Sequence, residues 1–195
     1  MLQKSDAPPN LWWCPTGPFA FLPIHAAGIY NTKEPERVSD YVVSSYTPAI
    51  SMLLNPVISP SHNSFKMVVV TQPKSLPYTR KELEKIRAHV PVNKLIQLES
   101  GTVKEVISHL PTTSIAHFAC HGQQNTQNPL QSALILQDGP LMVSQIMKQS
   151  MSNATLAFLS ACQTAMGVEN LPDEMIHLAS TLLFAGFPGV VATMW

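Results

Sequence analysis

Charged side chains are scarce in this sequence. Lysine, arginine, aspartate and glutamate make up 12% of the 195 residues, against roughly 25% in an average soluble domain. The 12 basic and 12 acidic side chains cancel, and no run of lysine or arginine could follow a phosphate backbone. We therefore expect no nucleic-acid partner. So little charge also indicates that part of the surface is covered or that the sequence is a piece of a longer protein.

Long apolar runs and paired cysteines are lacking as well. No apolar run reaches the roughly 20 residues of a transmembrane helix, and the first residues, Met1 to Asp6, lack the apolar core of a signal peptide. The three cysteines are odd in number and irregularly spaced, which argues against a disulfide framework. We expect a cytoplasmic protein with reduced thiols and no membrane partner. The 45% hydrophobic content excludes wholesale disorder.

Predicted strands and helices alternate from Phe65 onward. Unbroken apolar or β-branched runs predict buried strands, and apolar residues at helical spacing predict helices. The predicted strands cover residues 67–71, 94–98, 114–121, 132–136, 154–159 and 189–195, and the predicted helices cover 79–87, 102–110, 144–148 and 172–185. This alternation predicts an α/β fold with a mainly parallel sheet and helices on both faces.

The two ends of the sequence are harder to interpret. The first 64 residues contain many of the 17 prolines and show little periodicity, although residues 22–28 suit a helical turn, 41–46 a strand and 47–54 a helix. We expect residues 1–195 to form a single domain, with residues 1–11 disordered. Because the last predicted strand has no covering helix after it, we expect the fold to be truncated and to continue beyond Trp195.

Two of the predicted strands end in reactive side chains. Cys162 follows the strand at 154–159, while His121 and Gly122 close the strand that begins at Ser114. If both strands belong to one parallel sheet, their carboxyl ends lie on the same edge, and neighbouring strands are about 5 Å apart. A cysteine attacks carbonyls as a thiolate, so it needs a base, and His121 is the candidate. The N–H groups of Gly122 and Cys162 could form an oxyanion hole.

These segments resemble the motifs of a known family. His117–Gly122 (HFACHG) and Leu159–Thr164 (LSACQT) closely resemble the paired motifs of CHAT domains, which are caspase- and separase-like modules often found beside tetratricopeptide repeats. The resemblance continues through Asn128–Leu130, Asp173–Glu174, Ala185–Trp195, Leu22–Ala27 and Tyr41–Ser44. It implies a caspase-like three-layer sandwich. It also implies that His121 and Cys162 are the catalytic pair of a clan CD-like cysteine peptidase.

On these grounds we expect a cysteine endopeptidase that hydrolyses peptide bonds through a Cys-His dyad and an acyl-enzyme. It would need no cofactor or metal, and a protein or peptide substrate would bind extended along a strand edge. A non-catalytic interaction or scaffold domain, or a regulated pseudo-peptidase of a larger repeat-containing signalling protein, is the alternative. An acyltransferase or other thiol hydrolase using the same dyad is a third interpretation.

Other histidines and cysteines have simpler interpretations. Cys162 could itself be an ordinary core cysteine, and Cys120, one position from His121, is expected to face the core. His117 is expected to be buried and hydrogen-bonded. It could also join His121 and Cys162 as a zinc ligand, but no fourth ligand appears at metal spacing. Cys14 is expected to be structural, and His62, His89 and His109 are expected on the surface. His25 and His177 are expected to be core residues, and either could instead brace the site.

The acids near the expected cleft are few. Asp138, Glu169 and Asp173 are the carboxylates expected there, and Asp173 and Glu174 also suit the first turn of a helix. None is a strong candidate for setting substrate preference.

Overall fold

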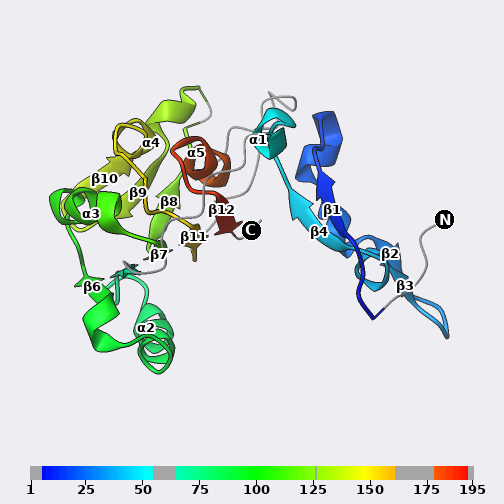
Figure 1. Ribbon diagram of the computed structural model, residues 1–195, viewed down its shortest axis with the longest axis horizontal. Coiled ribbons are helices and arrows are strands. Elements are labelled where there is room, and N and C mark those ends of the chain that lie inside the picture. The colour runs from blue at the N-terminus through cyan, green and yellow to red at the C-terminus, as the bar shows by residue number, and fades with distance from the viewer. Residues whose placement is uncertain (1–5, 55–64, 126, 161–177, 193–195) are drawn as a thin grey trace. The chain divides into compact units, whose positions relative to one another are not determined.

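The described residues of the chain form two compact units. The computed structural model describes residues 6–54, 65–125, 127–160 and 178–192 (Figure 1). The first unit comprises residues 6–54, and the remaining ranges belong to the second. None of the helices in these ranges combines the length and the apolar character that crossing a bilayer requires.

A five-stranded sheet forms the centre of the second unit. Its strands are β5 (Met67–Thr71), β6 (Leu95–Glu99), β7 (Ile115–Ala119), β11 (Leu156–Leu159) and β12 (Gly189–Ala192). They lie in the order β12-β11-β7-β5-β6, and every neighbouring pair is parallel. The predicted α/β class and parallel sheet are confirmed.

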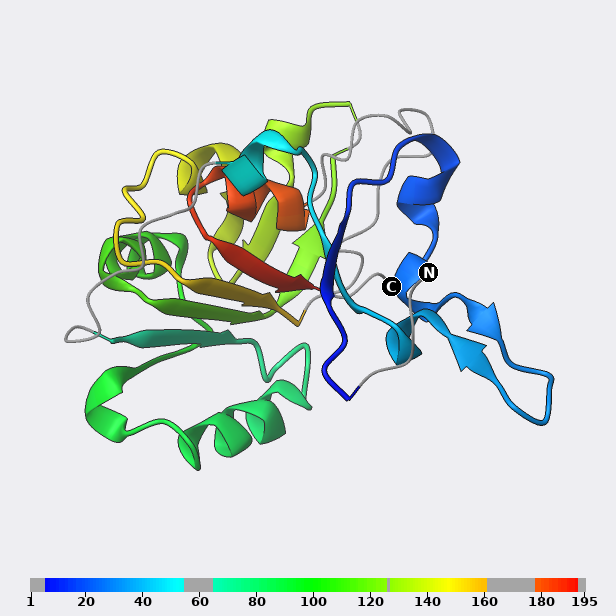
Figure 2. The same cartoon turned by 45° about the vertical axis from the view of Figure 1, so that its right-hand side comes forward.

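Helices cover both faces of this sheet. On one face, alternate strand residues such as Val68, Phe118 and Leu159 share a core with α3 (Val103–His109), α4 (Val143–Ile146) and α5 (Leu178–Phe184). On the other face, Met67, Val69 and Leu95 pack against Leu83 of α2 (Thr79–Arg87). Figure 2 shows α2 on one side of the sheet and the other three helices on the opposite side. Helix, sheet and helix thus make the three layers expected.

His121 lies on a strand of its own, which corrects the sequence prediction. The strand predicted at 114–121 is broken at Cys120: β7 ends at Ala119, and His121 begins β8 (His121–Gln123). β8 joins β9 (Ala133–Leu136) and β10 (Gly139–Met142) in a separate antiparallel sheet of order β10-β9-β8. The chain leaves the main sheet here because β8 pairs with β9. His117 and His121 therefore do not share one face of a strand, as a zinc site on both would have required.

The turn between β9 and β10 is tied to α3. Asp138 accepts a hydrogen bond through Oδ1 from the backbone N–H of Val103, at 2.8 Å, and the N–H of Gln137 donates to the carbonyl of Gly101. Thr102 and Glu105 complete the cap of the same helix. Asp138, which we expected near the cleft, instead stabilises the N-terminus of a helix.

The first unit contains two small sheets. β1 (Asn10–Trp13) pairs in parallel with β4 (Val43–Tyr46), and β2 (Gly28–Ile29) forms a hairpin with β3 (Glu36–Arg37). One short α-helix, α1 (Ser51–Leu54), follows. The 3₁₀ turns within the described ranges are Gly17–Phe21, Ile24–Ala26 and Val38–Asp40 in this unit, and Val92–Lys94, Leu110–Thr112 and Pro129–Gln131 in the other.

Several predictions for the first unit need correction. Asn10 and Leu11 lie in β1 rather than in a disordered segment, because β4 supplies a pairing partner. The helix predicted from residue 47 begins only at Ser51, since Thr47 directs its hydroxyl to the carbonyl of Ala49. His25 is exposed rather than in the core, and its Nδ1 lies 2.8 Å from the hydroxyl of Tyr46.

Candidate active site

The strands that lead to His121 and Cys162 are direct neighbours. β7 and β11 are parallel and adjacent, with Leu159 facing Phe118. One residue further on, the N–H of Ser160 donates a 2.9 Å hydrogen bond to the carbonyl of Phe118. The two strands therefore run side by side to the same carboxyl edge, as the sequence predicted. Cys162 itself lies outside the described residues, as do five other residues considered above, His62, Glu169, Asp173, Glu174 and His177.

His121 is accessible to a ligand. It is the first residue of β8, it is exposed, and its ring makes no hydrogen bond to any described residue. Gly122 follows and is half-buried. Because no described side chain is hydrogen-bonded to the ring, the backbone of β8 is the described feature that positions it.

The register of the small sheet determines which way Gly122 directs its backbone. Facing residues of an antiparallel pair alternate between those that exchange two N–H···O bonds and those that exchange none. Pro140 faces Ile135 and has no N–H, so that pair exchanges none. Ile135 must then turn its N–H and C=O toward β8, where it faces His121. By the same alternation, Gly122 turns its N–H away from β9, toward the edge of β8 that has no strand partner among the described residues.

The other two cysteines differ sharply in exposure. Cys120 is fully buried in the main core, as predicted, and this burial raises the pKa of its thiol to about 12. It is therefore unreactive as a nucleophile at neutral pH. Cys14, in the first unit, is exposed and not buried as a structural cysteine would be. Neither residue duplicates the role predicted for Cys162.

His117 links three elements of the second unit. It lies in β7, is 5% exposed, and stacks on the ring of Phe158 in β11 with ring centres 4.9 Å apart. Its Nε2 lies 3.1 Å from Oε1 of Glu82 in α2, but no hydrogen bond of good geometry forms, so the contact is electrostatic. Burial lowers the pKa of His117, and the nearby Glu82 carboxylate opposes this shift. The predicted burial is confirmed, although a close approach of Nε2 to the Glu82 carboxylate stands in place of the hydrogen bond that we expected.

The lowered pKa of His117 makes stability depend on pH. Below about pH 6.5 an unfolded histidine takes up a proton that folded His117 resists, so acid favours the unfolded state. We expect the free energy of unfolding to be highest above that pH and to fall as the pH drops toward the lowered pKa. Denaturant titrations at several pH values give this free energy. In His117→Gln it should fall less steeply with decreasing pH, and the slope should be smaller by at most about 1.4 kcal/mol per pH unit. In Glu82→Gln the loss of stability should continue to lower pH, because the carboxylate that raises the pKa of His117 is gone. Equal slopes in the parent chain and both variants would show that His117 is not the source of the pH dependence.

The loop after β8 is organised by Asn125. Its Oδ1 accepts the N–H groups of Gln127 and Asn128, and its own N–H donates to Oγ of Ser132. Its Nδ2 donates to Oε1 of Gln131. These bonds fix a loop of amide side chains that follows the strand carrying His121.

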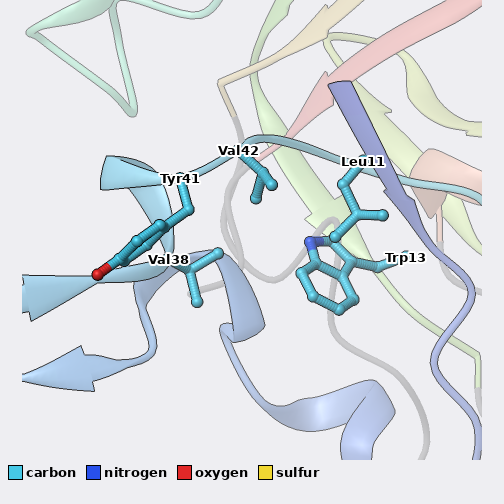
Figure 3. A pocket seen from close by; sticks show the side chains of 5 residues that line it. All are labelled: Leu11, Trp13, Val38, Tyr41 and Val42. Carbon is cyan, nitrogen blue, oxygen red and sulfur yellow. The ribbon is translucent and has the colours of Figure 1, made fainter. Parts of the chain in front are cut away.

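A separate hollow lies in the first unit (Figure 3). It has a volume of about 330 Å³ and is lined by Leu11, Trp13, Val38, Tyr41 and Val42. The indole N–H of Trp13 is buried there with no acceptor among the described residues, and the Tyr41 hydroxyl points away from the other four side chains. Such a hollow suits apolar groups, but it holds no nucleophile or base for catalysis.

The fold and the edge at β7 and β11 define a class. A five-stranded parallel sheet between two helical layers is the architecture of the caspase-like α/β proteins. The chain matches the CHAT domain family over residues 1–195 and belongs to it. This family is related to caspase-like peptidases, and its members are typically found with tetratricopeptide-repeat regions. A comparison with curated proteins found no match.

Sequence reasoning missed residues that support this edge. Glu82 is an ordinary exposed position of a charged helix in the sequence, and nothing there indicates its contact with His117. Gln72 could have been found, because it follows β5 at the same carboxyl edge as the other polar residues.

Proposed function

We propose that this domain is a cysteine endopeptidase that uses Cys162 as nucleophile and His121 as base. The observation that carries the proposal is the hydrogen bond from Ser160 to Phe118. It fixes the chain two residues before Cys162 against β7, three residues before His121. His121 and Cys162 can therefore meet at one edge although they are 41 positions apart in the sequence. Ser114 and Thr155 are separated by the same interval, and they are hydrogen-bonded where these two strands begin.

The proposed reaction proceeds in two steps. His121 accepts the thiol proton, and the sulfur of Cys162 attacks the carbonyl carbon of the peptide bond. The N–H groups of Gly122 and Cys162 stabilise the negative oxygen, and the imidazolium then gives its proton to the departing amine. Water, activated by the neutral imidazole, hydrolyses the thioester and regenerates the thiol. The orientation inferred for the Gly122 N–H, toward the open edge of β8, supports its part in this scheme.

The substrate would bind as an extended peptide along β8. This strand has a partner on one side among the described residues, so its other edge offers backbone groups for pairing. The exposed ring of His121 lies on the same strand. A peptide paired there would place its carbonyl groups beside both His121 and the Gly122 N–H.

Thiol labelling tests the proposal. A mixture of peptidyl acyloxymethyl ketones that differ in the residue next to the reactive group should label Cys162, as mapped by mass spectrometry. In His121→Ala the rate at Cys162 should fall at least about tenfold, because base catalysis typically contributes 10²–10⁴-fold. Exposed Cys14 provides an internal reference, and buried Cys120 should remain unlabelled in every variant.

The control variant is His109→Ala, which removes a histidine at the end of α3. It should leave labelling of Cys162 unchanged. If Cys162 reacts no faster than Cys14, or equally fast with and without His121, the peptidase proposal is wrong.

A non-catalytic interaction domain is the second candidate, and one observation favours it. The first unit exposes many large apolar side chains, which in a soluble protein mark contact surfaces. They are Trp12, Phe19, Leu22, Ile29, Tyr30, Val43, Ile50, Leu53 and Leu54. Labelling of Cys162 that is independent of His121, together with no peptide hydrolysis, would favour this function.

A further inference from the structure

We propose that Gln72 is a positioning residue for His121. The proposal rests on the function proposed for His121 above. Gln72 is the first residue after β5 and is 9% exposed. Its backbone carbonyl accepts the N–H groups of Ser75, at 3.2 Å, and Leu76, at 2.8 Å. The backbone of Gln72 is thus held by both a strand and a turn.

The amide of Gln72 reaches the strand that pairs with His121. Its Nε2 donates a 2.6 Å hydrogen bond to the carbonyl of Ile135 in β9. Ile135 is the residue that faces His121 across the β8–β9 pair. Because Pro140 lacks an N–H, Ile135 turns its backbone groups toward β8, as argued above. Gln72 therefore holds the peptide group that lies opposite His121.

The other ties of this small sheet are the buried Cys120, which joins β7 to β8, and contacts further from His121. The bonds from Val103 and Gln137 hold the turn between β9 and β10. Leu134 and Leu136 hold β9 to the core by apolar packing. Of the hydrogen bonds described here, that of Gln72 is the one that links the main sheet directly to the residue facing His121.

Among the described residues, the backbone of β8 positions the His121 ring, and the bond from Gln72 helps to fix that backbone. The side chain is exposed and is not hydrogen-bonded to a described residue. A displacement of about 1 Å can reduce a reaction rate on the order of 100-fold. Together with the buried Cys120 that joins β7 to β8, the bond from Gln72 fixes where β8 lies relative to β5, and so it helps to set the approach of the imidazole to the edge where Cys162 follows β11.

Gln72→Met tests this role, since methionine has similar length but no amide donor. Gln72→Glu is a second variant, because an ionised carboxylate cannot donate either. In both we expect labelling of Cys162 by the peptidyl ketone mixture to fall about tenfold, with Cys14 unchanged. The matched control is Gln97→Met, which removes a glutamine hydrogen-bonded to Arg87 on the opposite face of the sheet. It should label as the parent chain does.

Two readouts separate positioning from a general loss of structure. In the His121→Ala background, Gln72→Met should cause no further loss, because both changes act through one imidazole. In NMR spectra of the whole chain, Gln72→Met should shift the His121 ring signals and leave those of His109 in place. Additive losses, or unshifted His121 signals, would overturn the inference. The NMR test holds even if Cys162 proves unreactive, so failure of the peptidase proposal is distinguishable from failure of this one.

Discussion

Peptide hydrolysis by this chain is expected to fall by roughly 10³-fold or more in Cys162→Ala, and by a similar factor in His121→Ala. The double variant should lose no more than the worse single variant. The reason is that the two side chains act as a unit, so removing either one leaves the other without a partner. Cleavage of a pool of quenched fluorescent peptides, measured as kcat/KM for each variant, checks this.

Two substitutions serve as controls for that experiment. Cys14→Ala removes the exposed thiol of the first unit, and His109→Ala removes a histidine from the end of α3. Neither should change kcat/KM beyond experimental error. Losses that add in the Cys162 and His121 double variant would show that the two residues act independently, which the dyad mechanism does not allow.

Removing the ring of Phe118 is expected to have the largest effect on stability. Phe118 is fully buried in β7, between the β5 and β11 neighbours Val70 and Leu159. Truncating a buried phenylalanine to alanine costs about 3–5 kcal/mol, because the favourable burial of the ring is lost and a cavity remains. Phe118→Ala should therefore unfold at a much lower denaturant concentration with an unchanged m value.

Phe184 provides the matched comparison. It lies in α5 and is 51% exposed, so Phe184→Ala should cost no more than about 1 kcal/mol. Equal losses in the two variants would mean that Phe118 is not the packed centre of the sheet.

The elements of the main sheet were predictable because their local signals are strong. The run Met67–Thr71 is apolar and β-branched without interruption, and all five of its residues are buried. The helix predicted at 79–87 is observed with the same bounds. Gly186 directly follows the helix predicted at 172–185 and has a φ of 111°, which favours glycine over other residues.

The break between β7 and β8 could not be predicted from local pattern. No glycine or proline separates Ala119 from His121, so nothing in the sequence marks the point where the chain leaves one sheet for another. The new pairing is decided by β9, which lies more than ten residues further on. The hairpin of β2 and β3 was missed for a similar reason, since each strand has two residues.

The supporting contacts of the site depend on tertiary structure. The pairing of His117 with Glu82 requires α2 to lie across the sheet, and the bond from Gln72 to Ile135 joins residues 63 positions apart. The sequence could indicate which side chains end the strands. It could not indicate which distant groups would hold them.

The strand order has a consequence for synthesis of the chain. The central strand β7 pairs on one side with β5 and on the other with β11. Where these strands begin, Ser114 is hydrogen-bonded to Lys66, 48 positions away, and to Thr155, 41 positions away. Long-range parallel pairing of this kind folds slowly, because large loops must close first. At about 5–20 residues per second, β5 leaves the ribosome several seconds before β11 exists. During that interval the valines of β5 have no completed core to enter, so recovery of the recombinant chain should improve with cooler growth or added chaperones.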